Sequence, residues 1–120
     1  MPSKPQTPLM QVEQIGDVTV VQFTRSAILD QNQIHGMAKQ LQGLMERVAH
    51  PQLVLDFSAV DHFSSSLLAQ LVGLHKKAQA AGGRLALCAL APALYEVFRI
   101  THMDRVLSIY RDEQEALQSF

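Results

Sequence analysis

The sequence lacks several features that mark common classes of protein. Its one cysteine, Cys88, rules out an internal disulfide and a zinc site built from several thiolates. No apolar run approaches the roughly 20 residues that cross a bilayer. Residues 1–8 also lack the apolar segment of a secretory signal. We therefore expect a cytoplasmic protein that does not insert into a membrane.

The sequence has no large excess of positive or negative charge. The chain has 10 Lys and Arg against 11 Asp and Glu, a formal net charge of −1. A protein that neutralises phosphates needs a basic surplus, so direct nucleic-acid binding is not expected. The 120 residues, of which 48% are hydrophobic, suffice for one domain. Three prolines predict a flexible N-terminal tail over residues 1–8, which leaves residues 9–120 as the domain.

Apolar patterning predicts alternating strands and helices along this domain. Two β-rich runs flank the turn pair Gly16-Asp17 and predict a hairpin. After it, helical spacing alternates with short apolar runs, and Gly82-Gly83 marks the end of a helix. The predicted strands cover residues 9–14, 18–23, 52–57, 84–90 and 106–110, and the predicted helices cover 30–48, 66–81, a segment from Pro92, and 112–120.

Strands separated by helices favour right-handed crossovers and a largely parallel sheet, and the initial hairpin makes that sheet mixed. The expected fold class is therefore α/β. It is a single domain with a mixed, mostly parallel sheet of four to five strands, about four helices and an initial β-hairpin. Asp30 or Asn32 is expected to cap the first helix.

Three consecutive serines, Ser64, Ser65 and Ser66, lie at the predicted start of the second helix. A serine at this place can accept hydrogen bonds from free backbone N–H groups and cap the helix. A phosphate there would instead add about −1.5 to −2 charges near the positive end of the helix dipole. The helix would tolerate that charge, whereas a partner packed on the same spot would meet new charge and bulk. Both interpretations of the serines, helix capping and a binding switch, stay open.

Patterns of catalysis and metal binding are weak. Asp61 and His62 precede the serines, but neighbouring residues of one loop rarely form a triad, and no Gly-x-Ser-x-Gly turn is present. A small esterase that uses Ser66 with His62 is an alternative that simple ester substrates would test. The five histidines include no His-x3-His pair. We expect no metal site, no cofactor and no enzymatic activity.

The stretch from Leu53 to Gly83 resembles the STAS family, and within it the bacterial anti-sigma factor antagonists. In that family a strand leads to a loop that ends Asp-Ser-Ser-Gly or Asp-Ser-Thr-Gly, and an apolar helix then ends in Gly-Gly. Here Ser64-Ser65-Ser66-Leu67 falls on the loop motif without a gap, and the likeness covers roughly residues 12–120. Further similar segments are Leu55–Val60, Gly73–Lys77, Gly82–Leu85, Leu90–Pro92, Phe98–Thr101 and Glu113–Leu117.

This chain departs from the family pattern near both predicted helix starts. Ser64 stands where the family has the acid that forms part of the phosphorylation site, and Leu67 stands where it has the glycine. Leu67 is therefore expected to place bulk next to the partner on the first helical turn. Of the Gly-Glu-Leu-Asp segment near the first helix, this chain keeps only the end, Leu29-Asp30.

The resemblance implies a regulatory binding protein whose partner is a kinase-like anti-sigma factor. It implies that phosphorylation of Ser66, or of Ser65 as second choice, blocks the interaction. An alternative within the family is a non-switching STAS subunit of a signalling scaffold or of a lipid-transport ATPase complex. A homo-oligomer also stays open. The partner-binding residues that the resemblance implies are Asp30, Ser64, Ser65, Ser66, Leu67 and Leu68.

Overall fold

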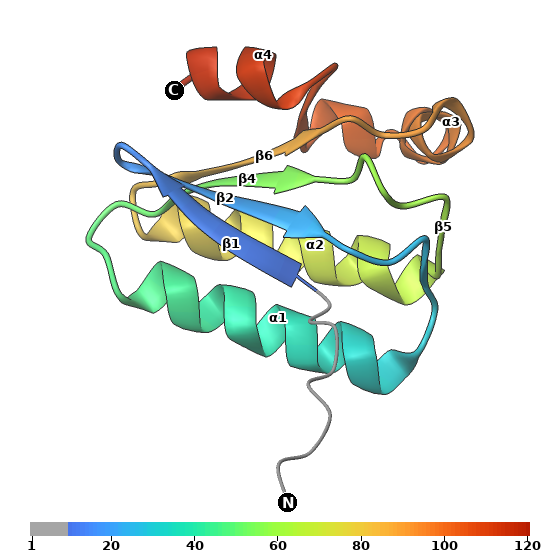
Figure 1. Ribbon diagram of the computed structural model, residues 1–120, viewed down its shortest axis with the longest axis horizontal. Coiled ribbons are helices and arrows are strands. Elements are labelled where there is room, and N and C mark those ends of the chain that lie inside the picture. Colours follow the sequence, from blue (N-terminus) through green and yellow to red (C-terminus); the bar gives the residue numbers. More distant parts are fainter. Residues whose placement is uncertain (1–9) are drawn as a thin grey trace, which may run out of the picture.

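The computed structural model describes residues 10–120 and shows a sheet with helices on both faces (Figure 1). The predicted tail over residues 1–8, together with Leu9, lies outside the described residues. The elements in chain order are β1 (Met10–Ile15), β2 (Val18–Phe23), β3 (Ala27–Ile28), α1 (Gln31–Glu46), β4 (Gln52–Asp56), β5 (His62–Phe63), α2 (Ser65–Ala80), β6 (Arg84–Cys88), α3 (Pro92–Ile100), the 3-10 helix η1 (Met103–Arg105), β7 (Ser108–Tyr110) and α4 (Glu113–Gln118).

The main sheet has five strands in the order β1-β2-β4-β6-β7. The β1–β2 pair is the antiparallel hairpin, and the three other neighbouring pairs are parallel. The expected α/β class, the mixed sheet and the four helices are thus confirmed. The sequence pattern does not predict β3 and β5, which form a separate two-stranded parallel sheet.

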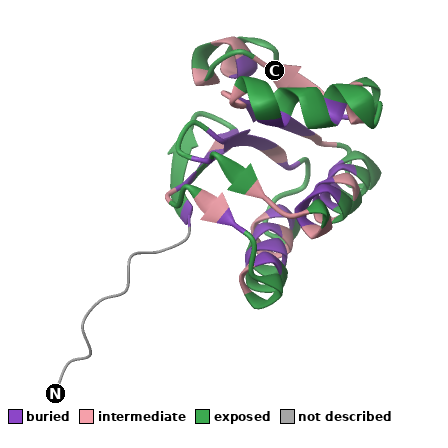
Figure 2. Cartoon of the chain, turned by 90° about the vertical axis from the view of Figure 1, so that its right-hand side faces the viewer, coloured by how far each residue is buried: buried purple, intermediate pink, exposed green. Residues whose placement is uncertain are grey.

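Alternating side chains of the central strands supply two hydrophobic cores, because successive residues of a strand point to opposite faces. Leu53 and Leu55 of β4 belong to the larger core, which includes the apolar faces of α1 and α2. Val54 belongs to the smaller core beneath α4, together with Ala116 of that helix. Buried positions accordingly lie on the inner sides of the helices (Figure 2).

A row of aromatic rings closes the larger core at the carboxyl ends of the parallel strands. Phe57, directly after β4, lies 4.8 Å from Phe23 and 6.2 Å from Phe63, measured between ring centroids. Phe63 in turn lies 5.7 Å from Phe98 of α3. Because Phe57 and Phe63 are both packed in this row, residues 58–61 form a loop whose two ends are fixed.

Candidate functional site

The β3–β5 pair brings the starts of α1 and α2 together. The carbonyl oxygen of Ser26 accepts hydrogen bonds from the backbone N–H groups of Asp61, at 2.7 Å, and His62, at 3.0 Å. The N–H of Ser64 donates to the carbonyl oxygen of Ile28 at 3.1 Å. The segment that enters α1 is therefore bonded to the segment that enters α2, and the two helices begin at the same end of the molecule (Figure 1).

Asp30 caps α1, so of the two candidates from the sequence, Asp30 and Asn32, the first is the N-cap. Its Oδ1 accepts hydrogen bonds from the backbone N–H groups of Asn32, at 2.7 Å, and Gln33, at 3.2 Å. A carboxylate at this position satisfies free donors and lies at the positive end of the helix dipole. The exposed Asp30 side chain is thereby held in one orientation beside the start of α2.

The three serines at the start of α2 occupy different environments. Ser64 is the N-cap residue, but its side chain makes no capping hydrogen bond, and its buried Oγ has no partner. Ser65 is the first helical residue and is exposed. Ser66 is half-buried, and its Oγ accepts a hydrogen bond from Nε2 of Gln31 at 3.0 Å. Helix capping by the Ser64 hydroxyl therefore does not explain this cluster.

Leu67 and Leu68 require a correction to the predicted partner surface. Leu67 is 0% exposed and Leu68 is 6% exposed, and both belong to the larger core. The bulk of Leu67 is directed inward, so it does not obstruct the first turn of α2. Neither side chain is available on the surface, and the site is correspondingly reduced to Asp30 and the serines.

Two further residues that the sequence argument missed, Leu29 and Gln31, lie beside the serines and Asp30 in this candidate site. Leu29, directly before the N-cap residue Asp30, is 56% exposed. Exposing an apolar side chain to water is unfavourable. Gln31 connects α1 to α2 through its hydrogen bond to Ser66. A large apolar residue immediately before a capping aspartate is a signal that could have identified Leu29, whereas the Gln31 contact depends on how the helices pack.

Other reactive side chains do not converge on the serines. Within residues 10–120, no hydrogen bond joins the side chain of His62 to Ser66, and no group of three or more His, Cys, Asp or Glu residues could hold a metal ion. Burial lowers the pKa of His75. Burial also raises the pKa of Cys88 to about 12, so its thiol stays protonated.

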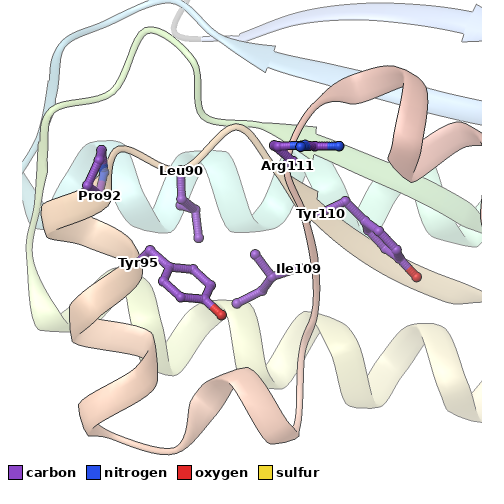
Figure 3. Close-up of a pocket in the computed structure, with 6 residues that line it drawn as sticks. All are labelled: Leu90, Pro92, Tyr95, Ile109, Tyr110 and Arg111. Carbon is purple, nitrogen blue, oxygen red and sulfur yellow. The ribbon is translucent and has the colours of Figure 1, made fainter.

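A separate cavity of about 450 Å³ lies between α3 and the end of β7 (Figure 3). None of the three serines lines it, so it is not part of the serine site. The residues that line the cavity are Leu90, Pro92, Tyr95, Ile109, Tyr110 and Arg111.

Among the described helices, none is long and apolar enough to cross a membrane.

The fold and the site together define a small α/β domain in which three consecutive serines lie at the start of a helix. The STAS domain family matches residues 10–116, and the chain belongs to that family.

Several solved structures share this fold. An anti-sigma-factor antagonist (STAS) domain protein from Planctomyces limnophilus is 28% identical, with a TM-score of 0.80 over 92% of this chain and 96% of that chain. An anti-sigma factor antagonist from Mycobacterium paratuberculosis is 24% identical, with a TM-score of 0.79 over 92% and 91%. The Bacillus cell fate determinant SpoIIAA in its phosphorylated form is 16% identical, with a TM-score of 0.69 over 92% and 97%. The chain therefore resembles anti-sigma factor antagonists at low sequence identity.

Proposed function

We propose that this chain is a non-catalytic regulatory protein that binds a kinase-like anti-sigma factor through the starts of α1 and α2. Phosphorylation of Ser66, with Ser65 as second choice, switches that binding off. The observation that carries the proposal is the hydrogen bond between Gln31 and Ser66. It joins two helix starts into one continuous surface, and a hydroxyl lies at its centre.

The contact surface that we propose consists of exposed or half-buried residues only. Ser65 and Ser66 provide the part that can be modified, and Asp30 adds a fixed negative charge. Leu29 contributes an apolar side chain that a partner could bury. Full burial of an exposed leucine side chain contributes roughly 1.5–3 kcal/mol. Leu29 would therefore be the apolar anchor of the interface.

A phosphate on Ser66 would change this surface without unfolding the helix. Its charge of about −1.5 to −2 would lie in the first turn of α2, where the helix dipole favours negative charge. The phosphate would also either push the Gln31 side chain away or accept a hydrogen bond from its amide group. A partner that fits the neutral hydroxyl beside Asp30 would instead meet added bulk and a second negative group. The switch therefore acts on binding and leaves the fold intact.

The test is a pull-down from a lysate of the source organism with four baits: wild type, Ser66→Ala, Ser66→Asp and Gln79→Asp. Gln79 is exposed near the far end of α2, about 20 Å from Ser66 along the helix at 1.5 Å per residue. It therefore controls for added charge on the same helix. Bound proteins are identified by mass spectrometry, and the recovered baits are examined for phosphate on Ser65 and Ser66.

We expect a kinase-like protein to be retained by wild type, Ser66→Ala and Gln79→Asp and to be lost with Ser66→Asp. Loss with Gln79→Asp as well would show that charge anywhere on α2 is enough, which contradicts a local switch. Scaffold or transporter subunits retained by all four baits, without phosphate on the serines, would support the alternative of a non-switching STAS subunit. The replacement of the family's acid by Ser64 is the observation that favours that alternative.

A further inference from the structure

Among residues 10–120, no strand pairs with the outer edge of β1. β1 is the end strand of the main sheet, and every one of its residues except Met10 is exposed. Edge strands are commonly blocked by lysine, proline or a bulge. The β1 sequence Met-Gln-Val-Glu-Gln-Ile has no lysine or proline, and its register with β2 runs without a bulge. Val12 in the middle of this edge is 50% exposed.

The hairpin register shows which backbone groups face outward. The two-residue turn Gly16-Asp17 closes on the pair Ile15 and Val18, and the pair that closes such a turn is hydrogen-bonded. Hydrogen-bonded and non-hydrogen-bonded pairs alternate along an antiparallel ladder. Met10, Val12 and Gln14 therefore direct their N–H and C=O groups away from β2, and the three residues are arranged symmetrically about Val12.

We propose that β1 pairs with β1 of a second copy of this chain, antiparallel, about a two-fold axis that passes beside Val12. In this register Val12 lies opposite Val12 of the second copy, and Met10 lies opposite Gln14 in both directions. Each outward N–H then has a carbonyl oxygen opposite it. The two sheets join into one of ten strands, and α1 and α2 of both copies lie on the same face of it.

The charge of β1 is compatible with its own copy as the occupant. Glu13 is the single charged residue of the strand. The register centred on Val12 places Glu13 opposite Gln11 of the second copy, so the two carboxylates are not paired with each other. A two-fold interface requires a self-complementary patch. The symmetric backbone groups, the exposed Val12 and the Glu13–Gln11 pairing together meet that requirement.

Sedimentation of the full chain over a range of concentrations tests the proposal. We expect wild type to reach twice the 13.3 kDa mass of the chain. The Val12→Pro variant removes an outward N–H without removing a bond to β2, which edge strands tolerate, so it is expected to be monomeric and folded by circular dichroism. The Val12→Lys variant is expected to raise the dissociation constant about tenfold or more, because like charges would then face each other.

Val106→Lys is the matched control, since Val106 is 49% exposed outside β1, and it is expected to leave the dimer unchanged. Val12→Cys adds a direct readout. Hydrogen-bonded antiparallel pairs have Cα atoms about 5.5 Å apart, within the usual 4.4–6.8 Å of a disulfide. A mild oxidant should therefore cross-link Val12→Cys but not Val106→Cys. A wild type that stays monomeric up to its solubility limit, or a dimer that survives both Val12→Pro and Val12→Lys, would overturn the proposal.

Discussion

The guanidinium carbon of Arg84 lies 4.3 Å from the centroid of the Phe120 ring. The same guanidinium donates a hydrogen bond from Nη1 to the hydroxyl of Tyr110 at 3.0 Å and another from Nη2 to Oγ of Ser119. Arg84 at the start of β6 thus holds the C-terminal end of the chain on the sheet. α4 and Phe120 in turn cover the smaller core, which contains the buried Cys88.

Arg84→Ala should loosen α4 and make Cys88 reactive. The cation–π contact contributes about 0.5–1 kcal/mol at an exposed site, and the hydrogen bonds contribute a similar amount each. Losing them should increase local opening of α4 about tenfold or more. The measurement is the rate at which a thiol reagent labels Cys88, which is slow in wild type because the thiol is buried. Arg99→Ala, at an exposed position of α3, is the control. Equal labelling rates for Arg84→Ala and wild type would contradict this role of Arg84.

Glu113→Gln should stabilise the protein at neutral pH. A hydrogen bond with the buried Asp56, and then burial, raise the pKa of Glu113 above its ordinary value of 4.5. A carboxyl group whose folded pKa is raised favours folding below its unfolded pKa, and this contribution is lost as the pH rises through the folded pKa. The neutral amide can donate to Asp56 at any pH, so the melting temperature at pH 7 should exceed that of wild type.

Thermal melts of Glu113→Gln between about pH 4 and pH 8 check this expectation. The difference from wild type should shrink toward about pH 4, where Glu113 itself is protonated. Glu46→Gln, an exposed position at the end of α1, should show no such pattern. A Glu113→Gln protein that melts below wild type at pH 7 would contradict the prediction.

The two N-cap residues should respond differently to removal. Asp30 accepts two backbone hydrogen bonds, so Asp30→Ala should lower the free energy of unfolding by about 1 kcal/mol or more. The Oγ of Ser64 is buried and unbonded, so Ser64→Ala should change that free energy by less than about 0.5 kcal/mol, or raise it. Urea unfolding measures both values. Equal losses would show that the Ser64 hydroxyl does cap α2.

Two glycines should behave in opposite ways when they are replaced by alanine. A Cβ at Gly83 would lie 1.8 Å from the carbonyl oxygen of Pro51, which also accepts a hydrogen bond from the N–H of Arg84 at 2.8 Å. Gly83→Ala should therefore cost about 3 kcal/mol or more. Gly73, in the interior of α2, has open space around its Cβ position, so Gly73→Ala should stabilise the helix by about 0.5–1 kcal/mol. Urea unfolding separates the two, and a mild effect at Gly83 would contradict the close contact.

Apolar patterning was enough to predict the main sheet and the four helices, because the central strands are continuous apolar runs and the helices bury apolar side chains toward the sheet. The same patterning could not reveal β3 and β5. Each has two residues, which is too short to show a repeat. Their pairing follows from the folded chain, which brings Ala27 beside His62 and Ile28 beside Phe63.

The location of the serines was predicted from the sequence, but the environment of each side chain was not. The position of Ser65 and Ser66 at a helix start follows from the end of the loop and the start of the apolar stripe. For Leu67, the helical spacing and the family resemblance gave different predictions. Its spacing with Leu71 and Leu74 indicates a buried face, whereas its correspondence with a family glycine indicated the surface. The structure follows the spacing. The free hydroxyl of Ser64 depends on tertiary packing, which no local pattern encodes.

The row of aromatic rings described above has a consequence for the kinetics of recognition. Phe57 and Phe63 fix both ends of the loop before α2, and the β3–β5 bonds tie that loop to the start of α1. A partner would meet a surface that is already in its final shape, so little conformational entropy would be lost on association. Under the proposed function, complex formation should then resemble the docking of two rigid bodies, and a phosphate on Ser66 would act by shortening the lifetime of the complex.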